Sequence, residues 1–417
     1  MATFRVGRFF GVLAGTVVIL AVGVYAPATL LGPLPAASAT PAESLAAPDA
    51  AGPVLGENGA SAVILSGDTV PFALGGSADA LPMASITKLV TALVVLDAKP
   101  IEPGAAGETR VIGTEDYQDY IDYSRDGART VVVFPNEKWT EREMLQALVL
   151  GSSNNHADTL ARWAFGSVDA YLAAASAWLA DQGLDGISVA DTNGLSPESR
   201  GTAADVTRLA ALVQAEPAIA EILANPPSAL VNNRGVTNTT AYLAEEGVTG
   251  ISRSYTDEAG VCLLFTASVA APEGSAETAP LTFSAVYLGS PDYDTLEADV
   301  RALMASAAAG AGTVPLIEKG ASYAAISTPW GATASAVAIT PQERRAWAAQ
   351  DASIDVQLDD FSTGSTGAII GSVTVATPGG EHRSRLQLDR AITDPGALWR
   401  LTNPVPVIGT LLASMQE

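Results

Sequence analysis

PMASITKLVTALVVL, residues 82–96, decides the fold of the central part of this chain. Its apolar residues surround almost the whole helical projection, so the segment predicts a helix enclosed by the fold and not a surface helix. Burying the charge of Lys88 in such a helix costs free energy. Ser85 lies three residues before Lys88, on the same helical face. We therefore expect an amine beside a hydroxyl near the start of a buried helix.

This pair has the residue types of nucleophilic catalysis. Burial favours the neutral form of an amine, which lets a buried lysine act as a base. A serine near a helix start gains from the helix dipole and from free main-chain N–H groups. Ser85 is thus a candidate nucleophile and Lys88 its activator. The alternative is that Ser85 caps the helix while Lys88 extends its amine to solvent.

Composition narrows the class of protein. The chain has 417 residues, 48% hydrophobic and 16% charged, so it can bury a large core and predicts two domains after a leader. Its 22 basic and 45 acidic residues give a net charge of −23, which argues against nucleic acid or an anionic membrane surface as the main partner. A single cysteine, Cys262, excludes an internal disulfide.

The N-terminal residues predict export. Arg5 and Arg8 precede an apolar run over residues 9–25, and basic residues there hold that end in the cytoplasm and send the rest outward. We expect residues 1–35 to be a signal peptide or a membrane anchor, the only membrane contact, and residues 36–55 to be a linker. Ala37-Ser38-Ala39 fits a cleavage site but lies far beyond the apolar run, which favours a retained anchor.

Residues 56–312 predict one α/β domain. Strand patterns at residues 61–65 and before Leu81, and later at 248–253, 261–267 and 281–288, enclose a series of helical patterns. Those helices are expected at residues 141–150, 157–165, 168–181, 203–214 and 292–309, the first opened by a capping box of Thr140 and Glu143. Early and late strands should therefore join in one sheet.

Residues 313–417 have a different sequence pattern. Short strand patterns at 332–339, 353–358, 368–376 and 383–388 alternate with Gly and Pro turns, which predicts a separate β-rich domain, expected as a small sandwich. The apolar tail, residues 398–415, is broken by Pro404 and Pro406 and is expected to pack on that domain.

A second polar motif follows the helix at 141–150. Ser152-Ser153-Asn154 lies between two helices, where serine and asparagine are also ordinary helix caps. With Ser85 and Lys88, however, Ser152 has the type for a proton relay and Asn154 for holding an amide. In these motifs the chain resembles the serine-type D-alanyl-D-alanine carboxypeptidases, the low-molecular-weight penicillin-binding proteins, whose motifs are S-x-x-K, S-x-N and K-T-G.

The resemblance spans residues 55–310 and includes residues 191–196 and 202–205, similar to the family's segment after these helices. It implies the transpeptidase fold shared by penicillin-binding proteins and β-lactamases, an antiparallel sheet with helices on both sides. The C-terminal β-rich region is similar to the family's accessory domain. No cofactor or metal is expected.

The third motif departs from the family pattern. Where the family has Lys-Thr-Gly, this chain has Ser252-Arg253-Ser254, followed by Tyr255. Successive side chains of a strand point to opposite faces, so Arg253 in a regular strand aims away from the site unless a bulge turns it. The family's glycine lets a substrate backbone approach the strand closely, whereas Ser254 places a side chain there.

The resemblance also implies roles. Ser85 would attack the carbonyl between the two terminal D-alanines of a peptidoglycan stem peptide, and Lys88 would take its proton. Ser152 would relay a proton to the leaving amine and Asn154 would orient the substrate amide. The N–H groups of Ser85 and of a residue near Tyr255 would form an oxyanion hole, worth about 3 kcal/mol per donor. Penicillins are expected to acylate Ser85.

Other functions compete with this one. The only histidines, His156 and His382, lack an H-E-x-x-H motif, which argues against a zinc hydrolase, and no G-x-S-x-G motif supports a Ser-His-Asp hydrolase. A class A β-lactamase would need a deacylating glutamate that residues 191–196 do not offer. The strongest rival is a non-catalytic family member that binds peptidoglycan or a wall-synthesis partner, and the altered third motif motivates it.

Overall fold

The computed structural model describes residues 6–41, 52–227, 229–230, 234–270, 279–347, 352–377 and 380–415. The chain divides into two compact units. The first, which we call the central unit, comprises Pro48–Val314 with Arg345–Gln350. The second, the terminal unit, comprises Met1–Ala47, Pro315–Arg344 and Asp351–Glu417, so it contains both ends of the chain.

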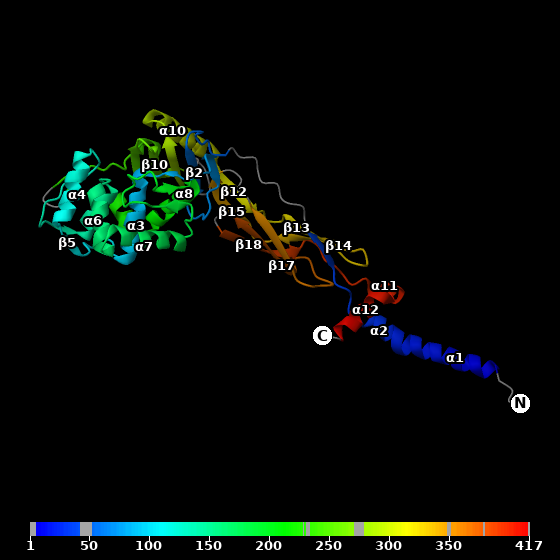
Figure 1. Ribbon diagram of the computed structural model, residues 1–417. Coiled ribbons are helices and arrows are strands. Elements are labelled where there is room, and N and C mark those ends of the chain that lie inside the picture. Colours follow the sequence, from blue (N-terminus) through cyan, green and yellow to red (C-terminus); the bar gives the residue numbers. More distant parts are fainter. Residues whose placement is uncertain are drawn as a thin grey trace. The chain divides into compact units, whose positions relative to one another are not determined.

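A five-stranded antiparallel sheet forms the middle of the central unit (Figure 1). Its strand order is β3-β2-β11-β10-β9, so the predicted pairing of early and late strands is confirmed: Val63 of β2 lies opposite Ala285 of β11. The strands are β2 (Ala60–Leu65), β3 (Ala73–Gly76), β9 (Val248–Thr256), β10 (Gly260–Val269) and β11 (Leu281–Ser290). Among the described strands β9 pairs with β10 alone, so its outer edge is open to other groups.

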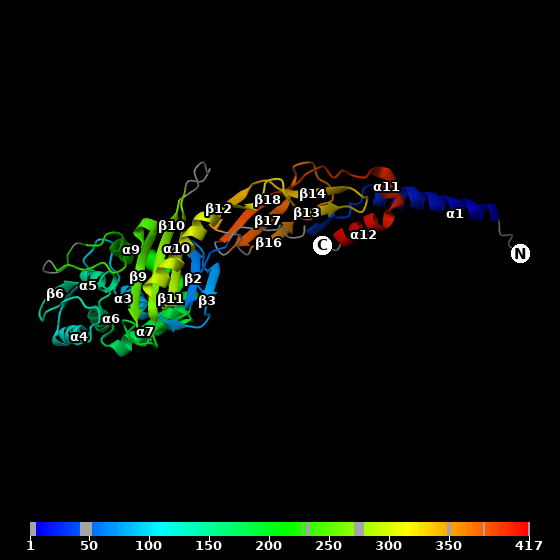
Figure 2. The ribbon, with the colours of Figure 1, turned by 90° about the horizontal axis from the view of Figure 1, so that it is seen from above.

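Helices cover both faces of this sheet (Figure 2). One face packs against α10 (Tyr293–Gly310), the other against α3 (Thr87–Ala98) and α8 (Ala203–Ala215). Every residue of α3 from Thr87 to Leu96 is buried, which confirms the predicted enclosed helix. The remaining helices are α4 (Thr114–Arg125), α5 (Glu141–Val149), α6 (Asn154–Phe165), α7 (Val168–Asp181) and α9 (Pro217–Ala224).

Local sequence signals explain several of these boundaries. The capping box at the start of α5 is confirmed: the Glu143 N–H donates to Thr140 Oγ1, and the Glu143 carboxylate accepts from the Thr140 N–H. Thr202 caps α8 in the same way, through the Asp205 N–H. Two small sheets complete the unit, one of β4 (Leu81–Pro82), β8 (Arg200–Gly201) and β7 (Ile187–Ser188), the other of β5 (Thr109–Val111) and β6 (Lys138–Thr140).

The terminal unit is built on a six-stranded antiparallel sheet in the order β1-β13-β14-β18-β17-β16. Its strands form one sheet, so the predicted small sandwich is wrong in this respect. The strands are β1 (Ser38–Pro41), β13 (Ser322–Ser327), β14 (Thr333–Ala338), β16 (Ser353–Leu358), β17 (Ile369–Thr377) and β18 (Gly380–Leu388). A separate pair is formed by β12 (Ala311–Ile317) and β15 (Gln342–Trp347).

The N-terminal residues contribute an edge strand to this sheet. Residues 38–41, which we predicted as part of a linker, form β1 and pair with β13, with Ala39 opposite Ile326. The rest of that linker, residues 42–51, lies outside the described residues. Upstream, the helical residues Phe9–Leu30 are long and apolar enough to cross a membrane, and they include α1 (Val6–Leu20) from Phe9 onward and α2 (Ala26–Leu30).

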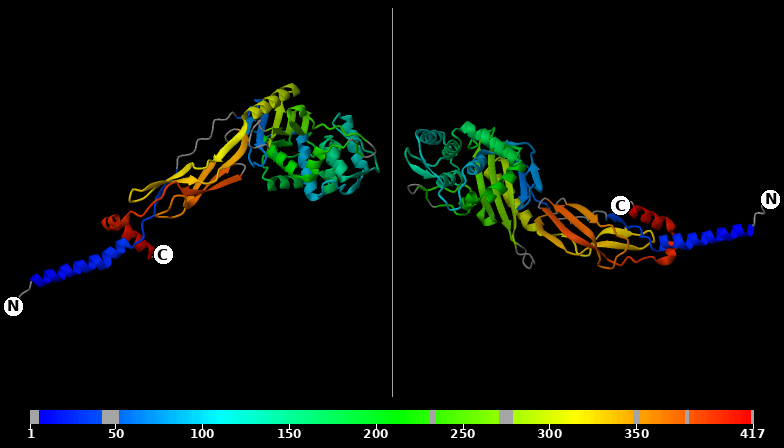
Figure 3. Two further views of the ribbon diagram at one scale, coloured as in Figure 1. Left: turned by 180° about the vertical axis from the view of Figure 1, so that it is seen from behind. Right: turned by 90° about the horizontal axis from the view of Figure 1, so that it is seen from below.

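The C-terminal tail forms two short helices, α11 (Gly396–Thr402) and α12 (Pro404–Ser414), which lie beside α2 in both views of Figure 3. The Arg400 guanidinium donates to the carbonyl of Gly32 at 2.7 Å, and the Trp399 ring contacts Trp330. The tail therefore packs within the terminal unit, as predicted.

Candidate active site

The hydroxyl and the amine predicted from residues 85 and 88 meet directly. Ser85 lies in a single 3₁₀ turn, Ala84–Ile86, that leads into α3, and the Lys88 ammonium donates to Ser85 Oγ at 2.8 Å. A second bond, from Lys88 Nζ to the carbonyl of Asn193 at 2.8 Å, fixes the amine from the other side. Lys88 does not extend to solvent, since only 2% of it is exposed.

The environment of Lys88 favours its neutral form. Burial lowers the pKa of Lys88 from 10.5 to about 7, because the enclosed helix offers little solvation for an ammonium ion. The carboxylates of Asp191 and Asp158 raise this pKa, whereas the nearby charge of Arg129 lowers it. Near neutral pH a large fraction of Lys88 is therefore deprotonated and able to accept the Ser85 proton.

The loop that holds Lys88 is packed closely against the turn that carries Ser85. Gly194 has φ +79°, and a Cβ there would lie 1.8 Å from the carbonyl oxygen of Ala84, so only glycine fits. Ala84 itself has φ +45°, which places Ser85 in a strained turn. Thr91 Oγ1 donates to the carbonyl of Thr192 at 2.6 Å and ties the loop to α3.

A chain of hydrogen bonds behind this loop was not predicted from the sequence. The Tyr123 hydroxyl donates to Asp158 at 2.6 Å and accepts from the Asn193 side-chain amide at 2.8 Å. Thr192 Oγ1 donates to the other oxygen of Asp158. These residues come from α4, α6 and the 191–194 loop. The loop lies in the segment 191–196 that resembles the family, whereas Tyr123 and Asp158 stand in no recognisable motif, so no sequence signal identified those two.

Ser152 of the second motif lies at the same cavity. Ser152 has φ +51°, an uncommon conformation for a residue with a side chain, and it lines the cavity with Ser85 and Lys88. Its Oγ and the Oδ1 of Asn154 are buried, and neither has a hydrogen-bond partner among the residues that the structure describes. Buried polar groups are normally paired, so these two atoms are available to a bound molecule.

The third motif divides between the two faces of the sheet. Residues directly opposite in an antiparallel pair share a face, and Ser252 and Ser254 lie opposite Leu264 and Cys262, on the face of α3. Ser252 lines the cavity, and Ser254 Oγ is buried with no partner in the described part of the chain. Tyr255 is exposed, and its hydroxyl donates to Asp257 at 2.9 Å.

Arg253 lies opposite Leu263, on the face packed against α10. Its guanidinium is centred 5.3 Å from the ring of Tyr242 and 5.9 Å from the ring of Tyr293. A bulge does occur in β9, but it falls before Ser252 and does not turn the arginine. Alternation along the strand therefore directs the Arg253 guanidinium to the face of α10, as expected for a regular strand, and a role of Arg253 in substrate binding stays a prediction.

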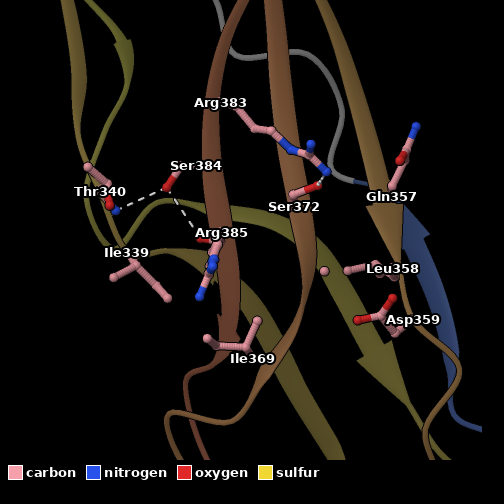
Figure 4. A pocket seen from close by; sticks show the side chains of 11 residues that line it. Ile339, Thr340, Gln357, Leu358, Asp359, Ile369, Ser372, Arg383, Ser384 and Arg385 are labelled. Carbon is pink, nitrogen blue, oxygen red and sulfur yellow. Dashed lines mark hydrogen bonds between the residues drawn. The ribbon is translucent and has the colours of Figure 1, made fainter.

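The cavity beside Ser85 is small, about 10 Å³, room for roughly one water molecule. A much larger hollow, about 1040 Å³, lies in the terminal unit (Figure 4). There Arg383 donates to Ser372 at 2.8 Å and shares its strand with Ser384 and Arg385. Ser372 and Ser384 of this hollow are buried, but their hydroxyls accept hydrogen bonds from Arg383 and the Thr340 N–H. None of the described residues that line the hollow is a lysine or histidine that could act as a base on them.

His156 is structural in this setting. It is fully buried, its Nδ1 lies 2.8 Å from Ser153 Oγ, and its ring packs on Trp139. Burial lowers the pKa of His156 to about 3, so the ring is neutral near pH 7. Among the described residues no group of three His, Cys, Asp or Glu side chains is placed to bind a metal ion.

Comparison with known proteins identifies the family. The family model described as D-alanyl-D-alanine carboxypeptidase matches residues 60–273, about half of the chain. The chain belongs to the D-alanyl-D-alanine carboxypeptidase family. A curated relative, a D-alanyl-D-alanine endopeptidase from Pseudomonas aeruginosa, is 27% identical in an alignment over 200 residues that covers 45% of this chain. The chain spans about 60% of the length of that relative.

Solved structures of this family share the fold. Penicillin-binding protein 5 from Haemophilus influenzae matches with a TM-score of 0.57 and 16% identity, over 84% of this chain and 100% of that one. Penicillin-binding protein 6B from Escherichia coli matches with a TM-score of 0.57 and 16% identity, over 83% of this chain and 99% of that one. The predicted transpeptidase fold with a C-terminal β domain is therefore confirmed.

Proposed function

We propose that this protein is a serine peptidase that removes the terminal D-alanine of peptidoglycan stem peptides through an acyl-enzyme on Ser85. The observation that carries the proposal is the 2.8 Å bond between Lys88 Nζ and Ser85 Oγ, made by a buried amine whose pKa is lowered to about 7. Membership of the D-alanyl-D-alanine carboxypeptidase family supports the substrate class.

In the first step, neutral Lys88 takes the Ser85 proton while Ser85 Oγ attacks the carbonyl carbon before the last D-alanine. The tetrahedral oxyanion accepts hydrogen bonds from the Ser85 N–H and from the N–H of Tyr255 on the edge strand. Proton transfer through Ser152 to the leaving amine breaks the peptide bond and frees D-alanine. Water, deprotonated by Lys88, then attacks the Ser85 ester and releases the shortened peptide.

Labelling with a fluorescent penicillin tests this proposal. We expect the wild-type chain to form a covalent adduct, and both Ser85→Ala and Lys88→Met to form none, because one lacks the nucleophile and the other the base. Release of D-alanine from a stem pentapeptide should be lost in the same variants. Hydrolysis of cross-linked dimers alone would instead indicate an endopeptidase, like the named relative.

A non-catalytic, peptide-binding protein is the second candidate. The small cavity and the Ser252-Arg253-Ser254 sequence favour it. Wild-type protein that binds the stem pentapeptide but shows neither Ser85-dependent labelling nor D-alanine release would support this candidate and overturn the peptidase.

We also propose that the N-terminal helix stays attached as a membrane anchor and places the protein on the outer side of the membrane. Residues just after it are part of the terminal unit: Leu34 is buried, its carbonyl accepts from Ser362 Oγ at 2.8 Å, and the Ala37 N–H donates to Phe361 at 2.8 Å. Cleavage after Ala39 would remove these contacts and half of β1.

Intact mass of the protein purified from membranes tests the anchor. We expect residues 9–30 to be present in the mature chain. A chain that starts at residue 26 should leave the membrane yet keep β1, whereas one that starts at residue 40 should have a less stable terminal unit. A mature protein that begins at Thr40 would refute the proposal.

A further inference from the structure

Arg129 bridges the two walls of the candidate site. Its carbonyl accepts from the Asn154 N–H at 2.9 Å, at the start of α6. Its guanidinium donates through Nη1 to the carbonyl of Arg253 at 3.1 Å, in β9. Two residues further on, the Val131 N–H donates to Ser153 Oγ at 3.1 Å, so the backbone near Arg129 is held against the second motif. The side chain itself is exposed at the site.

The contact with Arg253 identifies the edge that a substrate can use. The Arg253 carbonyl accepts from Arg129, which lies outside the sheet, so we infer that it points to the open edge of β9. Main-chain groups alternate along a strand, so the N–H and carbonyl of Tyr255 point to the same edge, ~7 Å further along. An extended peptide can add to such an edge.

Charge singles out Arg129 among the cations near this edge. Lys88 is buried and must be neutral to act as a base, and the Arg253 guanidinium lies on the opposite face. Arg129 has no carboxylate within 4 Å in the part of the chain that the structure describes, so its charge is not already neutralised by a close partner. The Arg129 charge also lowers the pKa of Lys88, so the guanidinium lies near enough to act on the candidate site.

We propose that Arg129 binds the C-terminal carboxylate of the substrate peptide. The inference rests on the proposed function, which gives the substrate a carboxylate one residue beyond the attacked carbonyl. When that carbonyl lies between the N–H groups of Ser85 and Tyr255, the carboxylate falls within reach of the Arg129 guanidinium, which is hydrogen-bonded to the Arg253 carbonyl. On binding, the Arg129 guanidinium exchanges the neutral Arg253 carbonyl for the anionic carboxylate. A hydrogen bond to a charged acceptor is stronger than one to a neutral acceptor.

Binding to the full chain in detergent micelles tests this inference without requiring catalysis. The probes are acetylated L-lysyl-D-alanyl-D-alanine and its C-terminal amide, titrated calorimetrically into Ser85→Ala protein with Arg129 intact, as Arg129→Ala or as Arg129→Lys. We expect Arg129→Ala to weaken binding of the acid by about tenfold to hundredfold and to leave the amide almost unchanged. Arg129→Lys should restore part of the difference, since it keeps the charge but not the fork geometry.

Arg125→Ala is the matched control, because Arg125 is exposed on α4 and pairs with Asp122 at 2.9 Å. It should change neither affinity. Equal weakening of the acid and the amide by Arg129→Ala would assign Arg129 a merely structural role and overturn the inference, as would no weakening or no measurable binding of the acid. Failure of penicillin labelling in the wild type, with the acid preference intact, would overturn the peptidase proposal alone.

Discussion

Lys88 provides the most quantitative prediction, because its amine is buried and its pKa is about 7. The perturbation is Lys88→Met, which keeps an unbranched side chain and removes the titrating group. In the wild type the amine should lose its proton near pH 7, and Ser85 acylation should rise with pH through the same value, since only the neutral amine can accept the serine proton.

The magnitude follows from the difference between the folded and the unfolded chain. A fall of the Lys88 pKa from 10.5 to about 7 corresponds to roughly 5 kcal/mol of unfavourable folding free energy. Below pH 7 both states carry the proton and the whole cost is present. Between pH 7 and 10.5 the unfolded chain binds more protons, so the stability of the wild type rises with pH across this window. The Lys88→Met variant lacks this contribution.

Two measurements check the prediction. The chain has only four lysines, Lys88, Lys99, Lys138 and Lys319, so lysine labelled with ¹³C at Cε gives few NMR signals, which single Lys→Arg variants assign. The Lys88 signal should titrate near pH 7. Urea denaturation at pH 6.5, 8 and 10 should show that the free energy of unfolding of the wild type rises with pH relative to that of Lys88→Met, by up to roughly 5 kcal/mol. A Lys88 signal that titrates above pH 9, with a constant stability difference, would refute this reasoning.

Three further predictions concern the surroundings of the site. Asp158→Asn should move the acid limb of the acylation profile to lower pH, because the Asp158 charge raises the pKa of Lys88; a profile that moves to higher pH would contradict this assignment. Gly194→Ala should abolish penicillin labelling and lower stability by several kcal/mol, since its Cβ would overlap the Ala84 carbonyl. Gly104→Ala, with φ +78° but open space around the Cβ, is its control and should keep labelling. Thr140→Ala should cost about 1 kcal/mol in urea denaturation by removing the α5 cap, and an unchanged midpoint would argue against that role.

Sequence patterns predicted the features that arise within one element. The all-apolar surroundings of Lys88 indicated an enclosed helix, and the three-residue spacing placed its amine beside Ser85, because both properties depend only on the helical repeat. The Thr140–Glu143 capping box likewise needs only four consecutive residues. Alternation along β9 correctly suggested that Arg253 points away from the site.

The rest of the site depended on segments distant in the chain. Asn193, Tyr123, Asp158 and Arg129 come from two helices and two loops, and only packing brings them around Ser85 and Lys88. In the same way β1 is too short to be recognised alone and exists because β13 offers it an open edge.

By itself, then, the sequence determined that the Ser85 hydroxyl meets the Lys88 amine, and it determined the class of fold, since local periodicity encodes both. Tertiary structure decided the pKa of the base, which depends on burial by distant elements, and it decided which arginine faces the edge strand. Solvation and charge at a site are sums over everything packed around it, and no single segment contains that information.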